Sequence, residues 1–281
     1  MLRYWTAGES HGKTLLALVD GFPAGFELDL EAINYDLKMR QGGYGRGGRQ
    51  KIETDKVEVL TGIWKNVTMG SPVTLQVINK DYKLERMKDL ERPRPGHGDL
   101  TGAVKYLGSI RNILERASAR ETAVRVAAGA IARKIINLKT KKETKITGAL
   151  VQIGNSKINY QNWDDKFISK NEFFCPDKKV LDKWKELIIQ ARKEGSSLGA
   201  IIEIRASGIP AGLGEPVYEK IDSDIAKSIM TINAVKGVEI GNGFNSVYES
   251  GISNVDEMGI KNNKPFFYSN NNGGVLGGIT T

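Results

Sequence analysis

The spacing of apolar residues along the chain predicts interspersed strands and helices. Runs rich in β-branched or alternating apolar residues favour strands, and apolar positions three or four residues apart favour helices. We predict strands within residues 1–28, 52–63, 72–79, 145–153 and 199–207, helices over 29–40, 118–137, 179–194 and 222–233, and glycine-rich strands to the end. The short strand–helix–strand rhythm of a doubly wound sheet is largely missing, which favours an α+β or mixed sandwich.

The clearest helix covers residues 118–137. Ser118 and Glu121 match a capping box, and one face carries small and branched apolar side chains, which predicts a tightly packed helix. A helix N-terminus offers free N–H groups to an anion, and Arg116 and Arg120 would add charge there. On this segment alone, simple capping with the arginines in surface ion pairs explains the pattern equally well.

Two further segments could bind an anion. Residues 42–49 are too rich in glycine for a regular element, and Arg40 and Arg46 could close over a ligand there, although a disordered surface loop fits equally. Residues 80–100 are predicted to be mostly loop. Within them, the stretch from Arg92 to Asp99 combines arginines, prolines, glycines and His97, a proton donor beside an anion site, whereas a rigid structural loop would explain only its prolines.

Composition and charge narrow the function classes. The 281 residues include 41 Lys and Arg against 33 Asp and Glu, a net charge of +8. Because the arginines lie in glycine-rich, motif-like segments, small polyanions are favoured over nucleic acid. No apolar run reaches the roughly 18 residues of a membrane span, and no signal peptide is visible. A single cysteine, Cys175, excludes an internal disulfide and predicts a cytoplasmic location.

The segment Gly8–Gly12 matches the G-x-S-x-G pattern of α/β-hydrolases. We reject a serine hydrolase because only seven residues precede the pattern, and because His97 is the sole later histidine. What remains is a histidine beside a tight turn. The two histidines of the chain, His11 and His97, are therefore the candidate acid–base pair. No metal site is expected.

Taken together, these segments resemble chorismate synthase. Residues 8–12 are similar to the first signature of that family and residues 116–129 to the second. The Arg-Pro-Gly-His block at 94–97, the block at 232–237 and the final glycines follow in the family's order. The resemblance covers essentially all of residues 1–281 as a single domain. It implies an α+β fold, a β-α-β sandwich with helices packed between mostly antiparallel sheets, assembled as a homotetramer.

The resemblance also implies an activity, that of a carbon–oxygen lyase acting on phosphates. Such enzymes convert 5-enolpyruvylshikimate 3-phosphate to chorismate by anti-1,4-elimination of phosphate, the last common step of the shikimate pathway, with reduced FMN and no net redox change. NADPH is a candidate source of the reducing equivalents. His11 would protonate the leaving phosphate and His97 the reduced flavin. The implied phosphate contacts, to substrate or NADP, are Arg40, Arg46 and Arg120. The implied FMN contacts are Arg116, Ala117, Ser118, Asn233, Ala234, Gly277 and Gly278.

The chain departs from the family pattern at its end. Family members continue beyond the final glycines with a Lys-Pro-Thr segment and an Arg-x-Asp-Pro motif, whose Asp acts with the flavin. The sequence stops at Thr281, so the domain is expected to be C-terminally incomplete. We expect a protein that ends there to bind FMN weakly and to have little activity, which a flavin fluorescence titration would measure.

A non-catalytic module that binds polyanions or nucleic acid through its arginine and glycine loops is the alternative interpretation. The ordered motifs favour the enzyme, with a small-molecule substrate and neither nucleic acid nor a membrane as a partner. Phosphate release from the enolpyruvyl substrate would support the enzyme. A steeply salt-dependent affinity for duplex nucleic acid would support the module.

Overall fold

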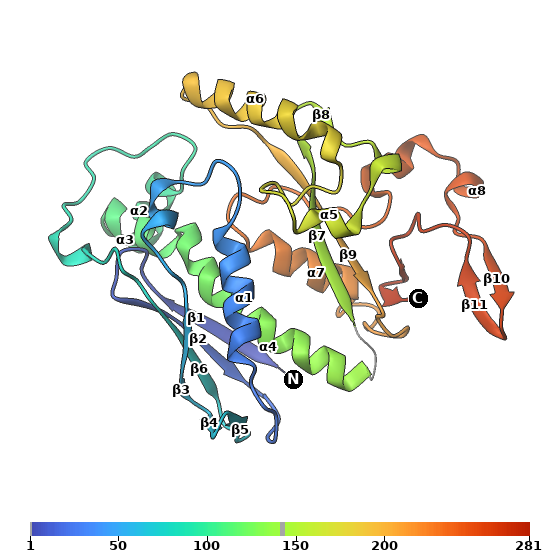
Figure 1. The fold of residues 1–281 in the computed structure, drawn as a ribbon, viewed down its shortest axis with the longest axis horizontal. Coiled ribbons are helices and arrows are strands. Elements are labelled where there is room, and N and C mark those ends of the chain that lie inside the picture. The colour runs from blue at the N-terminus through green and yellow to red at the C-terminus, as the bar shows by residue number, and fades with distance from the viewer. Residues whose placement is uncertain (1, 141–143) are drawn as a thin grey trace. The chain divides into compact units, whose positions relative to one another are not determined.

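The computed structural model describes residues 2–140 and 144–281 (Figure 1). The chain forms two compact units, Met1–Ser207 and Gly208–Thr281, and each is described by itself. Mixed helices and antiparallel sheets confirm the predicted α+β class. The prediction of one domain stays a prediction. No helix within the described ranges is long and apolar enough to cross a membrane.

A four-stranded antiparallel sheet opens the first unit, and two helices lie across it (Figure 1). The strands follow the order β1 (Arg3–Gly8), β2 (Thr14–Asp20), β6 (Val73–Ile78), β3 (Val57–Thr61). Alternate residues of β2 and β6 point to the same side and are fully buried there, against α1 (Leu30–Gln41) and α4 (Thr122–Thr140). The predicted strands and the predicted first helix are confirmed here.

The start of the long helix differs from its prediction. A 3-10 helix, η3 (Ala119–Glu121), comes first, and α4 begins at Thr122. The Ser118 hydroxyl accepts from the Arg120 N–H, so the capping box with Glu121 is wrong. The carboxylate of Glu121 instead accepts from the Thr6 hydroxyl at 2.6 Å. This tertiary bond outweighs the local capping pattern.

A smaller sheet and one long helix form a second core in the same unit. The strands are β8 (Ser156–Lys157), β7 (Lys145–Ile153) and β9 (Ala200–Ser207), in that order and antiparallel. Helix α6 (Leu181–Lys193) buries Trp184 completely, and the indole N–H donates to the carbonyl of Ser156 at 3.2 Å. Short helices η4 (Tyr160–Asn162), α5 (Asp165–Ile168) and η5 (Lys178–Val180) complete this core.

Several short elements of the first unit were not expected from the sequence. They are η1 (Gly48–Lys51), the hairpin β4 (Ile63–Trp64) and β5 (Val67–Thr68), η2 (Leu84–Arg86), α2 (Asp99–Tyr106) and α3 (Ile110–Arg116). Gly102 explains part of the omission because it weakens the helical pattern. A Cβ at Gly102 would lie 2.1 Å from Cγ1 of Ile113, so this glycine allows α2 and α3 to pack closely.

The second unit is built differently. It contains α7 (Ile221–Met230), η6 (Gly243–Tyr248), α8 (Gly251–Asn254) and two hairpins, β10 (Met258–Lys261) with β11 (Lys264–Phe267) and β12 (Val275–Leu276) with β13 (Ile279–Thr280). No apolar side chain of Gly208–Thr281 is buried. Its organising group is the carboxylate of Asp256, which accepts from the N–H groups of Asn271 and Asn272 and from the Ser269 hydroxyl.

Candidate active site

His11 lies in the turn between β1 and β2. Gly8 ends β1 with φ of 108°, and a Cβ there would meet the carbonyl oxygen of Thr14 at 2.4 Å, so the turn requires glycine. The carbonyl of His11 accepts from the N–H groups of Lys83 and Leu84 at 3.0 and 3.1 Å. The turn is therefore tied to the segment that follows β6, and its main chain has a defined position.

The side chain of His11 is bound by a glutamate from α3. Nδ1 of His11 lies 3.0 and 3.1 Å from the two carboxylate oxygens of Glu115, and the backbone N–H of His11 donates to the same carboxylate at 2.7 Å. On the other side of the ring, Nε2 is 3.9 Å from a carboxylate oxygen of Asp81. Asp81 is paired with Lys83, whose hydrogen bond holds the pKa of that carboxyl below its ordinary value.

Ser10 is hydrogen-bonded by an arginine. Its Oγ accepts from Nη1 of Arg49 at 2.7 Å, and its carbonyl accepts from Nη2 of the same arginine. Arg49 also contacts the carboxylate of Glu53. Burial disfavours ionisation of Glu53, but the N–H of Lys80 and the charge of Arg120 outweigh burial and lower the pKa of that carboxyl. Because Oγ accepts from a cation, these contacts do not activate Ser10 as a nucleophile.

Arg120 and Arg40 meet at one buried carboxylate. Nη1 of Arg120 lies 2.6 Å from Oδ1 of Asp55, and Nη1 of Arg40 lies 3.4 Å from Oδ2. Nε of Arg120 also donates to Asn79, whose amide donates to the carbonyl of Gly12 at 2.8 Å. Arg120 therefore supports the His11 turn through Asn79. The phosphate contact predicted for Arg120 stays a prediction.

Arg40 is enclosed as well. Its guanidinium donates to the hydroxyl of Thr122 and to the carbonyl of Ala119, at the start of α4. Burial lowers the pKa of Arg40 to about 10, which leaves the side chain charged at neutral pH. Arg46 lies in the glycine-rich loop with an exposed side chain. Of the three predicted phosphate-binding arginines, Arg40, Arg46 and Arg120, Arg46 is the most accessible.

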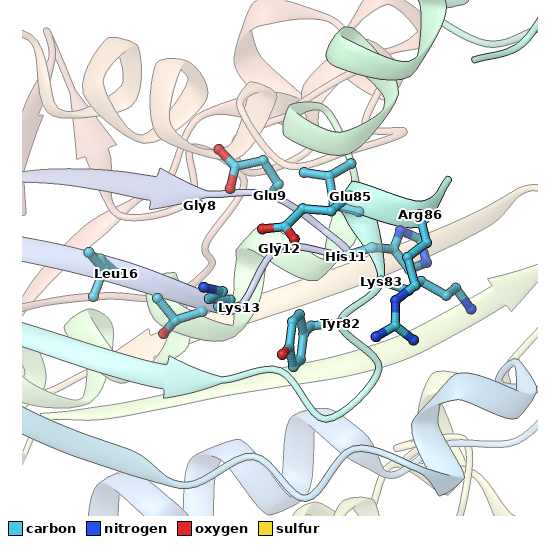
Figure 2. Close-up of a pocket in the computed structure, with 12 residues that line it drawn as sticks. Gly8, Glu9, His11, Gly12, Lys13, Leu16, Tyr82, Lys83, Glu85 and Arg86 are labelled. Carbon is cyan, nitrogen blue, oxygen red and sulfur yellow. The ribbon is translucent and has the colours of Figure 1, made fainter. Parts of the chain in front are cut away.

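A cavity of about 560 Å³ opens beside His11. Figure 2 shows that two segments line it, one from the turn between β1 and β2 and the other from the stretch after β6. Its cationic side chains are Lys13, Lys83 and Arg86, and its acidic ones are Glu9 and Glu85. Nε2 is the ring nitrogen of His11 not engaged by Glu115. The cavity therefore combines a histidine with cations that can attract an anion.

His97 has a different setting, in the loop before α2. Its ring is exposed, and Nδ1 lies 3.3 Å from the carbonyl oxygen of Pro95. The loop is held by Asp99, which accepts from Nε, Nη2 and the backbone N–H of Arg94 at 2.9 to 3.0 Å. These hydrogen bonds hold the pKa of Asp99 at about 2. Asp99 thus orients Arg94 rather than the imidazole.

The remaining predicted residues are divided between the two units. In the first unit Arg116 and Ala117 are exposed, and the guanidinium of Arg116 donates to the carbonyl of Thr6 at 2.8 Å. Ser118 is half-buried. In the second unit Asn233, Ala234 and Gly277 are exposed and Gly278 is buried.

Sequence reasoning missed four side chains around His11 and Ser10. They are Glu115, Asp81, Arg49 and Asn79. Glu115 lies 104 positions from His11, so local patterns give no indication of their contact. The one available hint is the charged residue at position 115, which directly follows the apolar pair Ile113 and Leu114.

The chain is similar to known proteins over nearly its whole length. The profile of the chorismate synthase family matches residues 2–281. Chorismate synthase of Pelagibacter ubique (strain HTCC1062) is 47% identical over 282 residues, which cover 99% of this chain and 78% of that protein. The Agrobacterium fabrum (strain C58 / ATCC 33970) chorismate synthase is 45% identical over 291 residues, covering 100% and 78%. A crystal structure of chorismate synthase superposes with a TM-score of 0.83 at 36% identity and covers 99% of this chain and 81% of that one. This chain therefore belongs to the chorismate synthase family.

Proposed function

We propose that the protein converts 5-enolpyruvylshikimate 3-phosphate to chorismate by anti-1,4-elimination of phosphate. Family membership over residues 2–281 supports this activity. In the reaction, the C–O bond to phosphate breaks with its electron pair leaving on the phosphate, and a proton leaves the carbon at the far end of the allylic system. Substrate and product lie at the same oxidation level. The enzyme is a carbon–oxygen lyase.

The single observation that carries the proposed mechanism is the setting of His11. The ring is held by Glu115 through Nδ1 and lines a cavity with Lys13, Lys83 and Arg86. A leaving phosphate gains negative charge, so a proton donor and nearby cations both stabilise its departure. We assign to Nε2 of His11 the proton that the phosphate takes up.

Arg40 and Arg46 are the proposed phosphate-binding arginines for substrate or NADP. Arg46 is an exposed residue although partial burial lowers the pKa of its guanidinium, so it suits a ligand that enters from solvent, and the two-pronged shape of guanidinium suits phosphate oxygens. Arg40 is fixed by Thr122 and Asp55 and would contribute charge from a defined position. Arg120 supports the turn of His11 through Asn79, and it is the third proposed phosphate-binding arginine.

Reduced FMN is the proposed cofactor, with NADPH as the proposed reductant. The residues of each unit suit such a group. In Met1–Ser207, Arg116 offers a guanidinium to a phosphate and Ala117 a small side chain to a flat ring; in Gly208–Thr281, Ala234 and Gly277 are exposed, with small or no side chains. Ser118, Asn233 and Gly278 complete the proposed cofactor set. When bound, reduced FMN supplies electron density that helps the phosphate to leave. His97, accessible in its loop, is the proposed proton donor on the cofactor side.

A homotetramer is the proposed assembly. Large apolar side chains are widely exposed in Gly208–Thr281, among them Phe244 at 74%, Tyr248 at 86% and Ile252 at 89% of their accessible surface. Exposed apolar area on this scale favours association. Light scattering coupled to size exclusion would measure the assembly, and a monomer at micromolar concentration would contradict it.

The activity is tested by anaerobic turnover of the full-length protein. Photoreduced FMN and 5-enolpyruvylshikimate 3-phosphate are mixed with the protein, and phosphate and chorismate are measured together. We expect equal amounts of both products and none without reduced flavin. Absence of both products, while the Pelagibacter ubique enzyme forms them under the same conditions, would sink the proposal.

A further inference from the structure

We infer that Glu115 is a positioning residue for His11: its carboxylate takes the Nδ1 hydrogen, so that Nε2 is the ring nitrogen that exchanges a proton with the ligand. The inference rests on the proposed function in one respect, namely that an anion receives a proton from His11. The contacts between the side chains of Glu115 and His11 do not depend on which anion it is. Three observations lead to it.

The first observation is the number of contacts between the two residues. Glu115 lies within 3.1 Å of Nδ1 through both of its oxygens, and one of these also accepts the backbone N–H of His11 at 2.7 Å. In addition, the backbone carbonyl of Glu115 accepts the N–H of Ser10 at 3.0 Å. One residue of α3 therefore fixes the main chain of the turn and the rotation of the imidazole.

The second observation is the burial of the carboxylate. The side chain of Glu115 is 1% exposed and that of His11 is 19% exposed. A buried carboxylate is costly without a compensating cation. Arg111 supplies one long contact, 3.5 Å from Nη1 to Oε1, while its other nitrogens donate to the carbonyl of Lys88. A protonated His11 ring, at 3.0 Å, would be the closer cation.

The third observation concerns the two sides of the ring. An ionised carboxylate only accepts hydrogen bonds, so Nδ1 must carry a hydrogen whenever it bonds Glu115. Nε2 faces Asp81 at 3.9 Å, which is too long for a hydrogen bond. Asp81 is itself paired with Lys83 at 3.0 Å and lies 3.9 Å from Arg49. Nε2 can therefore be approached by a ligand without breaking a bond to the protein.

This division of the ring has a chemical consequence. The neutral imidazole with hydrogen on Nδ1 has its lone pair at Nε2, and the protonated ring has an N–H donor at the same atom. After Nε2 gives its proton to the phosphate, the Nδ1–H bond to Glu115 remains and no rotation is needed before reprotonation. The charged groups that contact the ring, contact its two carboxylate neighbours or line its cavity are Glu115, Asp81, Arg111, Arg49, Lys13, Lys83, Arg86, Glu9 and Glu85.

The direct test is the tautomer of His11 in the wild-type protein. With 15N-labelled histidine, long-range proton–nitrogen spectra identify which nitrogen is protonated in the neutral ring, and His11→Asn assigns the signals. We expect His11 as the Nδ1–H form. His97, whose ring is exposed, serves as the internal reference. An Nε2–H form of neutral His11 overturns the inference, and this measurement on the wild type needs no turnover.

Glu115→Gln extends the test to catalysis. The amide keeps the shape of the carboxylate but not its charge and offers a donor as well as an acceptor, so both tautomers become populated. We expect kcat to fall on the order of 100-fold with KM changed less than about threefold, because the donor loses its fixed direction. Glu115→Asp, which keeps the charge, should recover part of kcat. An unchanged kcat in Glu115→Gln overturns the role.

Asp177→Asn is the matched control. Asp177 is also a fully buried carboxylate, but it accepts from the N–H groups of Asn159 and Lys179 in the second core of the same unit. Its variant should lose thermal stability and leave the His11 tautomer unchanged. Failure of the proposed activity would look different: no chorismate from any variant, with the Nδ1–H tautomer still present in the wild type.

Discussion

The two histidines are held in opposite ways. His11 lies in a turn fixed by backbone hydrogen bonds, and its ring is bound to a buried carboxylate on one side. His97 lies in an exposed loop, where the ordered group is the ion pair of Arg94 and Asp99 and the imidazole has one long contact to Pro95. The protein thus determines the direction in which His11 can donate a proton, whereas the direction of His97 is left to the bound ligands.

His11→Ala should have the largest effect. Removal of a positioned acid costs about 10²- to 10⁴-fold in rate, and the rigid surroundings of His11 leave no other group to replace it. We expect kcat to drop within that range while FMN affinity is largely kept. Anaerobic single-turnover phosphate release and a flavin titration on the same sample measure both. A rate within a few-fold of wild type would contradict the assigned role.

His97→Ala should also lose activity, but on the order of 100-fold. Because the loop is exposed, added imidazole can reach the vacated place. We expect imidazole at millimolar concentration to restore part of the rate in His97→Ala and little of it in His11→Ala. Equal rescue of both variants would show that the two sites do not differ in access.

Asp99→Asn tests what holds the loop of His97. The pKa of Asp99 is about 2 in the folded chain and about 3.9 in an unfolded one, so the folded state binds fewer protons. Its stabilisation is therefore present above about pH 4 and is lost as the pH falls toward 2. We expect the wild type to have a higher melting temperature than Asp99→Asn at pH 6, and we expect this difference to disappear at low pH. A difference in melting temperature that does not depend on pH would exclude the ion pair as its cause.

Arg94→Lys should have the smallest effect. Lysine keeps the charge but loses the paired hydrogen bonds of the guanidinium, and Arg94 is 47% exposed. For such a pair we expect the melting temperature to fall by about 2 °C or less. Differential scanning fluorimetry resolves this change. A larger drop would mean that the Arg94–Asp99 pair supports α2 as well as its own loop.

Sequence patterns predicted the elements whose signals are local. The strand pair around residues 8–12, the helix from Leu30 and the strand Lys145–Ile153 depend on alternation or helical spacing, and the structure confirms them. The acid–base role of His11 follows from the family resemblance and stays a prediction. Its partner Glu115 was not predicted, because the contact joins a turn and a helix end that are distant in sequence.

Contacts between segments that are distant in sequence also explain the wrong predictions at the helix starts. Ser118 and Glu121 have the spacing of a capping box, yet Glu121 bonds Thr6 of β1, which no local pattern contains. Helices α2 and α3 were not predicted because Gly102 weakens the helical pattern, whereas in the structure it permits their close crossing. Local rules failed where a second segment supplied the deciding contact.

The lack of buried apolar side chains in Gly208–Thr281 has a calorimetric consequence. Heat capacity rises on unfolding mainly because apolar surface becomes hydrated. In a chain that is not associated with others, much of the apolar surface of this unit is already in water, and local order depends on the polar bonds of Asp256. Its melting should therefore add little to the heat capacity change of the chain, and nearly all of that change should come from the two cores of Met1–Ser207.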